Sequence, residues 1–269
     1  MKKTGLLSAF FLLLGLFAGS CKSEFEKTRI SGDLPRIQKT ADSYYKQKKW
    51  QRAQSLYEIL LPSLKGSAKA EDVYYKYAWT HYQLNQYILG NYYFANFANT
   101  FTNSPLREEC QFMAAKCHYN LAPTYRLEQG YSEKAMDDFQ IFVNTFPTST
   151  RIGECNKLID DLRRRLEKKA YEEGELYYKL KQYQSALISF DNLLKDFPES
   201  PDVERTRYLT VKSSWLLAEN SVIAKKQERY QLTIEKTQQF LNKHSASKFV
   251  KEVRQIQESS NQQLNSFGK

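Results

Sequence analysis

The chain contains little glycine and proline and almost no histidine. Ten Gly and seven Pro occur among 269 residues, below the roughly 7% Gly and roughly 5% Pro of average proteins. A sheet of many strands needs more of these turn residues, so the composition predicts helices. The three histidines, His81, His118 and His244, leave no basis for a histidine-based metal site or a proton relay. We therefore expect no metal site and no metalloenzyme or hydrolase chemistry.

The common enzyme signatures are also missing. No GxSxG, HExxH, GxxxxGK[ST] or GxGxxG sequence occurs. Hydrophobic residues make up 41% of the chain and aromatic residues 14%, which is enough for a folded core and excludes intrinsic disorder as the main state. We expect a folded protein that binds other molecules without catalysis and without a cofactor.

Residues 1–20 have the pattern of a bacterial lipoprotein signal peptide. Lys2 and Lys3 precede an apolar run of 14 residues, 5–18, which is too short to span a bilayer comfortably. Small residues then lead into Cys21, as in the lipobox at which such signals are cut and the new terminal cysteine is acylated. The alternative is an ordinary signal peptide followed by a chance cysteine. We expect a lipid on Cys21, a tether over residues 21–33, a folded body over 34–258 and a polar tail over 259–269.

The charge of the chain is positive after the signal is removed. Without Lys2 and Lys3 the net charge is +8, which suits anionic head groups or an acidic partner surface. A solvated surface without specific meaning is the alternative. Nucleic-acid binding is not expected, because it requires clustered Lys and Arg and a cytoplasmic address, whereas the signal predicts export.

Three cysteines remain beside Cys21, an odd number that cannot all pair. Cys110 and Cys117 lie seven residues apart on one predicted helix face, about 10.5 Å along the axis and beyond disulfide reach. We interpret them as small core residues and Cys155 as a lone thiol on a helix face.

Five segments of the chain align on a small residue. The aligned small positions are Ala53, Gly90, Ala135, Ala186 and Thr233. Four residues later stand Tyr57, Phe94, Phe139, Phe190 and Thr237. Seven residues later stand Leu60, Phe97, Phe142, Leu193 and Phe240. These offsets form one stripe of a helix, and the small position predicts a close approach to a neighbouring helix. The repeats follow at spacings of 37, 45, 51 and 47 residues.

Two further offsets complete the repeat. Fourteen residues after each small position a serine stands as a candidate N-cap of the next helix: Ser67, Ser104, Ser149, Ser200 and Ser247. Twelve residues before it, Ala41, Ala78 and Gly174 supply the small residue of a preceding helix. This pattern resembles the tetratricopeptide repeat and predicts an all-α, tetratricopeptide-like helical solenoid of about five helix pairs. The longer spacings predict an inserted loop at 120–131 and an extra length of helix at 151–169.

A solenoid of this kind offers a surface lined by the first helix of each pair, and its default function is to hold peptides or proteins. Aromatic residues on that surface are candidate binding anchors. We expect a peptide groove formed by Tyr45, Lys46, Tyr75, Trp79 and Tyr82. Packing between repeats is the alternative role for each aromatic residue. Asp42, Tyr171 and Tyr178 lie on the same predicted face.

A basic stripe lies on the predicted extra helix. Arg163, Arg164 and Arg165, followed by Lys168 and Lys169, could meet an acidic partner surface. A solvated helix face is the alternative. We take the three arginines as candidates for partner docking.

The signal and the five repeats together resemble the BamD family, the lipoprotein subunit of the machine that folds and inserts β-barrel proteins into the outer membrane. The resemblance covers essentially the whole mature chain and is most specific over residues 135–200. The segments patterned as in that family are 123–129, 135–142, 146–149, 162–166, 177–178 and 197–198.

The resemblance implies a lipid-anchored scaffold of the outer membrane that faces the periplasm. It implies that the C-terminal repeats bind the periplasmic domains of the barrel-forming subunit, and that the N-terminal groove receives a targeting segment of unfolded outer-membrane proteins. The alternatives are a tetratricopeptide-type lipoprotein that coordinates cell-envelope synthesis or division, and a surface lipoprotein that binds glycans through its aromatic residues.

Overall fold

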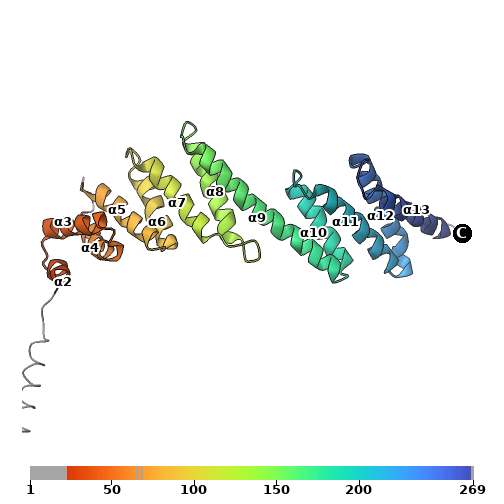
Figure 1. The fold of residues 1–269 in the computed structure, drawn as a ribbon, viewed down its shortest axis with the longest axis horizontal. Helices are drawn as coiled ribbons and strands as arrows, with labels where there is room; N and C mark the ends of the chain where they lie inside the picture. The colour runs from red at the N-terminus through yellow and green to blue at the C-terminus, as the bar shows by residue number, and fades with distance from the viewer. Residues whose placement is uncertain (1–22, 65, 68, 268–269) are drawn as a thin grey trace, which may run out of the picture. The chain divides into compact units, whose positions relative to one another are not determined.

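The computed structural model describes residues 23–64, 66–67 and 69–267, and every regular element in this part is a helix (Figure 1). The twelve helices are α2 (Glu24–Arg29), α3 (Leu34–Lys46), α4 (Trp50–Ser63), α5 (Ala70–Gln83), α6 (Tyr87–Thr100), α7 (Arg107–Leu121), α8 (Gly130–Thr145), α9 (Ile152–Lys179), α10 (Tyr183–Asp196), α11 (Val203–Glu219), α12 (Ile223–Lys243) and α13 (Val250–Phe267). The predicted all-α class is confirmed. The predicted signal peptide and Cys21 lie outside the described residues.

The helices divide between two compact units. Unit 1 comprises Met1–Leu121 and Lys134–Ile152, and unit 2 comprises Ala122–Glu133 and Gly153–Lys269. Within unit 1, helices α3 to α7 pack in sequence, each against the next; within unit 2, helices α10 to α13 do the same (Figure 1). This sequential packing of helix hairpins is the tetratricopeptide-like arrangement that the repeat predicts. The pairs are α3/α4, α5/α6, α7/α8, α9/α10 and α11/α12, and α13 follows as a single helix against α12.

The aligned stripe forms the core of each unit. All five small residues are buried, on α4, α6, α8, α10 and α12, and so are all residues at offsets +4 and +7. The largest fully buried side chains are drawn mainly from these positions, among them Tyr57, Phe94, Phe139, Phe190 and Phe240. Burial of a large apolar side chain contributes about 1.5–3 kcal/mol, so the offsets found in the sequence mark the main source of stability.

Helix α9 shows why the small position matters. Gly174 is buried on α9, and a Cβ atom built there would lie 2.5 Å from Cε1 of Phe190 on α10. Real Cβ atoms do not approach so closely, so only glycine lets the ring pack against the helix backbone. This helix has 28 residues, and its N-terminal half is the predicted extra length before the fourth pair.

Three turns between paired helices share one geometry. Lys48, Asn85 and Lys181 follow the C-caps of α3, α5 and α9 and have φ values of 58°, 58° and 59°. In the first turn, the Lys49 N–H donates to the Tyr44 carbonyl and the Lys48 N–H donates to the Tyr45 carbonyl. This is the Schellman pattern, which needs a left-handed residue at the helix end. Asparagine tolerates that conformation better than lysine does.

The repeated serines join two elements, but not as the predicted N-caps. Each precedes the first residue of the next helix by three positions, and the N-cap of α11 is Asp202 rather than Ser200. Ser104 Oγ accepts from the Leu106 N–H at 3.0 Å and donates to Glu71 at 2.5 Å. Equivalent pairs link Ser149 to Glu108, Ser200 to Glu167 and Ser247 to Glu204. The N-cap prediction was wrong because a short turn separates the serine from the helix.

The two ends of the body differ from the expected tether and tail. Residues 24–29 form α2, whose Phe25 ring lies 5.9 Å from that of Tyr44 on α3. At the other end α13 continues through the expected polar tail to Phe267, with Ser260 buried and the Phe267 ring 6.5 Å from that of Tyr230. Both segments are mostly polar, and in each of them one aromatic side chain, Phe25 or Phe267, makes an apolar contact with a neighbouring helix.

The close approach at Gly174 predicts a measurable cost of one added methyl group. We expect Gly174→Ala to lower the free energy of unfolding by about 2 kcal/mol, because the Phe190 ring must move out of its packed position. Denaturant unfolding followed by circular dichroism measures this. Gly153→Ala on the same helix is the control: its Cβ would meet nothing within 4 Å, so we expect no loss and a gain of up to about 0.5 kcal/mol. Equal effects of the two changes would contradict the packing role.

Candidate functional site

In unit 1 the first helices of the pairs are joined by polar side chains. Lys76 on α5 reaches Asp42 on α3, with Nζ 2.9 Å from Oδ1. Tyr75 on α5 donates its hydroxyl proton to Glu109 on α7 at 3.1 Å. These contacts hold α3, α5 and α7 together along the face on which the groove residues were predicted.

The predicted groove aromatics are half-buried and pack against the second helices. The Tyr45 ring lies 5.3 Å from that of Trp50, the Tyr75 ring 6.1 Å from that of Phe97, and the Trp79 ring 5.6 Å from that of Phe94. The three aromatics of α5 also contact one another in a row, in which the Trp79 ring lies 6.3 Å from that of Tyr75 and 5.5 Å from that of Tyr82. Each aromatic therefore contributes one side to the core and leaves another accessible.

Lys46 differs from these aromatics because it is exposed. It lines a hollow of about 520 Å³ beside α3, together with Pro35, Gln38, Lys39, Asp42, Ser43 and Lys69. The structure thus brings Tyr75, Trp79 and Tyr82 together on α5 and places Lys46 at a separate polar hollow.

Burial raises the pKa of two of the groove tyrosines. It raises the pKa of Tyr45 to about 12, against the lowering effect of nearby Lys76. Burial and the charge of Glu109 raise the pKa of Tyr75 above its ordinary value of 10.0. The Tyr75 hydroxyl already donates its proton to Glu109, so a bound chain can use only its oxygen, as an acceptor.

Unit 2 has a corresponding network between its first helices. Glu175 on α9 accepts from the Tyr171 hydroxyl at 2.8 Å and pairs with Arg205 of α11 at 2.9 Å and with Lys179 at 3.2 Å. Further along, Glu252 on α13 accepts from the Tyr208 hydroxyl at 2.6 Å. Tyr171, which was expected on this face, is therefore part of the contact between α9 and α11.

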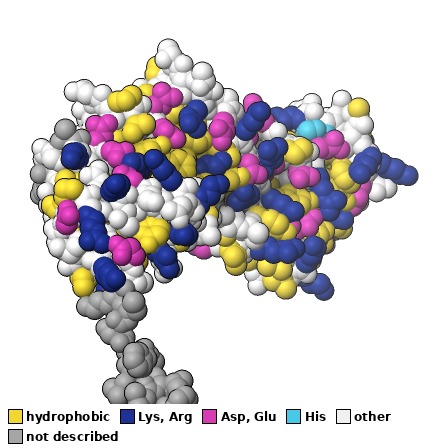
Figure 2. Space-filling view, turned by 60° about the vertical axis from the view of Figure 1, so that its left-hand side comes forward, with side chains coloured by type: hydrophobic (Ala, Val, Ile, Leu, Met, Phe, Trp, Pro, Cys, Tyr) yellow, Lys and Arg dark blue, Asp and Glu magenta, His cyan; other side chains and the backbone are white. Residues whose placement is uncertain are grey.

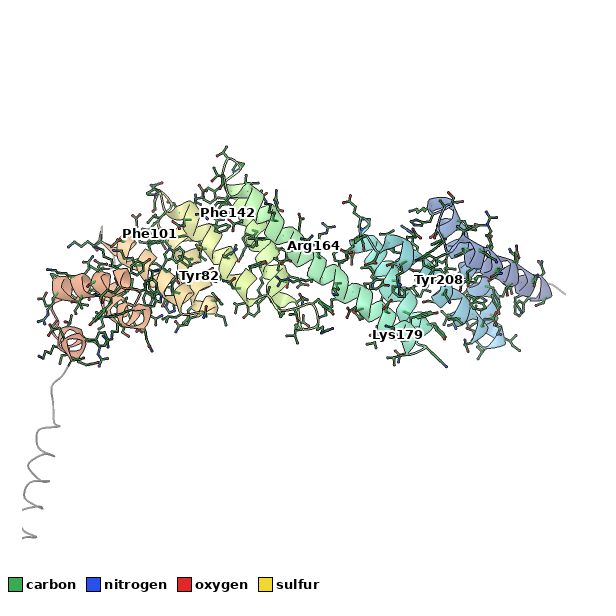
Figure 3. All side chains as sticks on the ribbon, in the orientation of Figure 1. Tyr82, Phe101, Phe142, Arg164, Lys179 and Tyr208 are labelled. Atoms are coloured by element: carbon green, nitrogen blue, oxygen red, sulfur yellow. The ribbon has the colours of Figure 1, made fainter. Side chains whose placement is uncertain are left out.

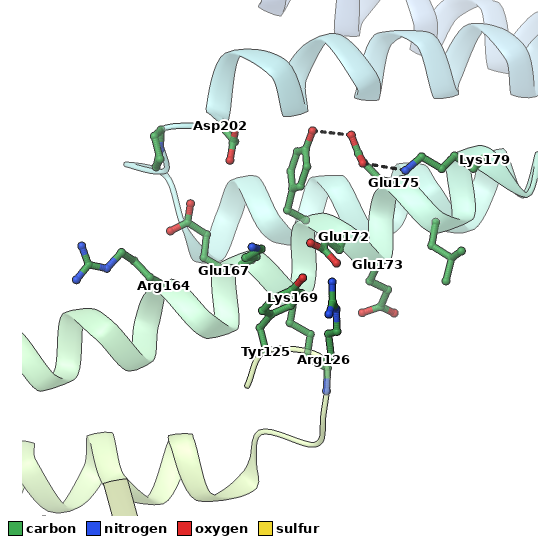
Figure 4. Close-up of a pocket in the computed structure, with 14 residues that line it drawn as sticks. Tyr125, Arg126, Arg164, Glu167, Lys169, Glu172, Glu173, Glu175, Lys179 and Asp202 are labelled. Atoms are coloured by element: carbon green, nitrogen blue, oxygen red, sulfur yellow. Dashed lines mark hydrogen bonds and ion pairs between the residues drawn. The ribbon is translucent and has the colours of Figure 1, made fainter. Parts of the chain in front are cut away.

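A cleft of about 940 Å³ lies in unit 2 beside α9 (Figure 4). The loop at 122–129 forms one wall, and α9 supplies most of the lining. The lining residues are Tyr125, Arg126, Arg164, Glu167, Lys168, Lys169, Tyr171, Glu172, Glu173, Glu175, Leu176, Lys179, Pro201 and Asp202. The volume suits a short segment of polypeptide, and the lining offers both charges around an aromatic floor.

The loop wall is fixed by side-chain contacts. Lys168 Nζ lies 4.3 Å from the centre of the Tyr125 ring, and Arg126 Cζ lies 5.2 Å from it. Lys169 donates to the Leu127 carbonyl at 2.9 Å, and the buried Gln129 amide donates to the Thr124 and Leu127 carbonyls. The predicted inserted loop is therefore an ordered part of the site.

The three predicted docking arginines point to different neighbours. Arg163 Cζ lies 5.7 Å from the centre of the Phe197 ring, and Arg165 donates to the Ala122 and Pro123 carbonyls and pairs with Asp161 at 2.6 Å. Arg164 is exposed and lines the cleft (Figure 3, Figure 4). Successive residues of a helix project about 100° apart, so a run of three cannot form one face.

The sequence pattern pointed to Lys168, Lys169 and Tyr171 but did not single out the loop residues Tyr125 and Arg126. A spacing of four residues was the available signal: Arg164, Lys168, Glu172 and Leu176 recur at that interval and all line the cleft. The loop side chains gave no periodic signal.

The described residues contain no group of three or more His, Cys, Asp or Glu arranged to hold a metal ion. Cys110, Cys117 and Cys155 are buried. Burial raises the pKa of the Cys117 thiol to about 12 and raises that of Cys110 as well. Within the same part of the chain, no helix is both long enough and apolar enough to cross a bilayer.

The Glu175 network predicts acid sensitivity. Burial raises the pKa of Glu175, but hydrogen bonds from Tyr171, Arg205 and Lys179 outweigh it and hold the pKa below its ordinary value of 4.5. A depressed pKa gives stability that is fully present above the unfolded value and is lost as the pH falls through the folded value. We therefore expect the free energy of unfolding to decrease below about pH 4.5, and Glu175→Gln to reduce that decrease.

Denaturant titrations at several pH values measure this effect. Glu173→Gln is the control, since Glu173 is exposed two residues away and takes no part in the Glu175 network. Identical pH profiles for the native chain and Glu175→Gln would contradict the linkage.

Comparison with known proteins agrees with the fold. A family model described as YfiO, outer membrane lipoprotein, matches residues 35–229, from the second residue of α3 into α12. No curated protein matches the chain at a significant level. The family match spans more than half of the chain and parts or all of the five helix pairs. The chain therefore belongs to the YfiO family of outer membrane lipoproteins, the family also called BamD.

Proposed function

We propose that this lipoprotein is the scaffold of the machine that inserts β-barrel proteins into the outer membrane. It holds the barrel-forming subunit by that subunit's periplasmic domains and receives segments of unfolded barrel proteins. Its chemistry is recognition, with no bond made or broken and no cofactor other than the covalent lipid. The membership of the outer-membrane lipoprotein family across the helix pairs carries this proposal.

The anchor in this proposal is the acylated Cys21. Support comes from the basic start, the short apolar run and the small residues that precede the cysteine. The acyl chains bury enough methylene groups to hold a protein on a bilayer. The body then faces the periplasm.

The α5 aromatics form the proposed groove for substrate. Tyr75, Trp79 and Tyr82 present accessible ring surface in one row. An extended segment that ends in an aromatic residue would stack on the rings, and its backbone N–H groups would donate to the tyrosine hydroxyl oxygens.

The cleft in unit 2 is the proposed dock for the barrel-forming subunit. Arg164 has no carboxylate partner within the described residues and is exposed in the cleft, with Lys168 beside it. Glu172 and Glu173 lie on the same helix without basic partners among those residues. A partner surface with an acidic side chain near Arg164 and a basic one near Glu172 would be complementary.

Purification of the lipoprotein from its own membranes in mild detergent, followed by mass spectrometry, tests the function. We expect to recover a large outer-membrane barrel protein with periplasmic domains. A cell-wall enzyme or a glycan transporter in its place would move the function to one of the alternative classes. In the same experiment we expect Arg164→Glu to reduce recovery of the barrel protein on the order of tenfold, since reversing one charge of a close pair costs about 1.4 kcal/mol or more.

A control variant separates the cleft from net charge. Lys251→Glu changes the charge equally at an exposed position of α13 outside the cleft, and we expect full recovery. Equal loss with both variants would remove the cleft as the dock while leaving the identity of the partner established.

Binding of a synthetic aromatic-ended peptide tests the groove. We expect Tyr75→Ala with Trp79→Ala to raise the Kd on the order of tenfold, which corresponds to about 1.4 kcal/mol. These rings also touch Phe97 and Phe94, so helicity and unfolding are measured together with affinity.

Tyr92→Ala is the matched control for the groove. Tyr92 is an aromatic residue on α6 with 57% of its surface exposed, and its loss should leave peptide affinity unchanged. Unchanged affinity in all of these variants would remove the groove.

A further inference from the structure

The short helix α2 is attached firmly to the first helix pair. Its Phe25 ring lies 5.9 Å from that of Tyr44, and Arg52 Cζ of α4 lies 5.8 Å from the Phe25 ring centre. Glu24 pairs with Arg36 of α3 at 2.6 Å, and Thr28 is buried. Residues 24–29 therefore move with the body of unit 1 and do not act as a free linker.

This attachment leaves almost no chain between the proposed lipid and the body. Only Lys22 separates Cys21 from Ser23, the N-cap of α2. Two successive Cα–Cα steps of about 3.8 Å span at most roughly 7.6 Å. If Cys21 carries the anchor, α2 must lie at the level of the lipid head groups.

The surface beside α2 carries cations that lack acidic partners. We define the anchor-proximal face by Lys27 of α2, Lys46, Lys48 and Lys49 around the end of α3, and Arg52 of α4; all five are exposed. Lys49 Nζ and Arg52 Cζ lie 5.8 Å and 5.5 Å from the centre of the Tyr44 ring. None of the five forms an ion pair with a carboxylate within the described residues.

The neighbouring carboxylates are mostly occupied by contacts within the chain. Glu24 pairs with Arg36, Glu26 pairs with Arg29, Asp33 accepts from the Arg36 N–H as the N-cap of α3, and Asp42 pairs with Lys76. Among the acidic residues of 23–64, only Glu58 has no such contact. Figure 2 shows Lys and Arg side chains, with a few carboxylates among them, on the part of unit 1 next to the start of the described chain.

An apolar side chain completes this surface. Ile30, the C-cap of α2, has 58% of its surface exposed. Exposed cations on α2 and the first helix pair, with an exposed apolar residue at the end of α2, are the pattern of a protein surface that rests on anionic lipid. On such a surface the cations meet phosphate groups and the apolar side chain enters the head-group layer.

We propose that the anchor-proximal face docks on the anionic phospholipid head groups of the bilayer that holds the lipid anchor. This inference rests on the proposed acylation of Cys21. The lipid would then fix the chain to the membrane, and the five cations would fix the orientation of unit 1 upon it. A tether alone would leave that orientation free.

Access to a cysteine introduced beside this face tests the docking on the full lipidated chain. The site is Gln51→Cys, exposed on α4 next to Arg52. Background labelling is low because Cys110, Cys117 and Cys155 are buried. The protein is reconstituted in vesicles of phosphatidylcholine alone or with about 30 mol % phosphatidylglycerol as the anionic lipid. Flotation with the vesicles is measured first, and then the rate of labelling by a bulky, membrane-impermeant maleimide.

We expect the phosphatidylglycerol vesicles to slow labelling at position 51 by roughly fivefold, the factor that one Lys or Arg contact with an anionic surface provides. Salt at about 0.5 M, where the Debye length is roughly 4 Å, should restore the rate without releasing the protein from the vesicles. A cysteine at the exposed Gln255 of α13 should label at the same rate on both vesicles.

Charge reversal provides the matched comparison. Lys27→Glu with Lys49→Glu should restore labelling at position 51. Lys243→Glu with Lys248→Glu should not restore labelling. These two residues match the first pair, because Lys243 is exposed without an ion pair in the described chain and Lys248 lies over the Phe249 ring as Lys49 lies over the Tyr44 ring. If a charge-reversal variant does not fold, the salt measurement on the protein without charge reversal still tests the proposal.

Two failures are distinguishable. Equal labelling rates at position 51 on the two vesicles, in a protein that floats with both, would overturn the docking and leave the lipid anchor intact. Failure to float would remove the anchor itself, and with it the reason to place α2 at the membrane surface.

Discussion

Contact between a small residue on one helix and an aromatic ring on the next is the interaction on which this structure depends. At Gly174 the ring of Phe190 lies where a Cβ atom would be too close, so the ring packs directly against the α9 backbone. Ala41 and Ala78 occupy the equivalent buried positions in the first two pairs. Each helix packs against the next one along the chain, so the contacts are local in sequence. The first helices of successive pairs in a unit then lie side by side and form one surface. The groove residues and the cleft both lie on helices that contribute to such surfaces.

The core was predictable because it repeats. A small residue followed by large ones at +4 and +7 appears four times, and a fifth time with Thr237 at +4. This recurrence is enough to predict which side of each second helix is buried. The serine at +14 was equally regular, yet its role was assigned to the wrong position. Its hydroxyl bonds Glu71, Glu108, Glu167 or Glu204 on the first helix of the same pair. A repeat in sequence shows that a residue type is required at a position. It does not identify a hydrogen-bond partner 33 to 43 residues away, because that partner depends on how the two helices of the pair are packed.

The candidate site was less predictable than the core because its residues do not repeat. Arg163, Arg164 and Arg165 are alike in sequence, but helix geometry assigns one to a phenylalanine ring, one to the cleft and one to the carbonyls of a loop. Tyr125 became part of the cleft through its position between Lys168 and Arg126, which no spacing rule encodes. Helix α2 was missed for a similar reason, since a single ring, Phe25, decides whether a polar segment folds back on the body.

The burial of Cys110 and Cys117 on α7 has a consequence for how the chain survives export. A lipoprotein of the outer membrane must cross the periplasm, which is kept oxidising. A thiol exchanges with disulfides only as the thiolate, and burial holds the pKa of both thiols far above neutrality. Once the third helix pair has folded, these cysteines are inert toward the oxidising enzymes around them. Before that point they are ordinary reactive thiols, so the speed at which this pair closes sets the time available for mispairing with other exported proteins.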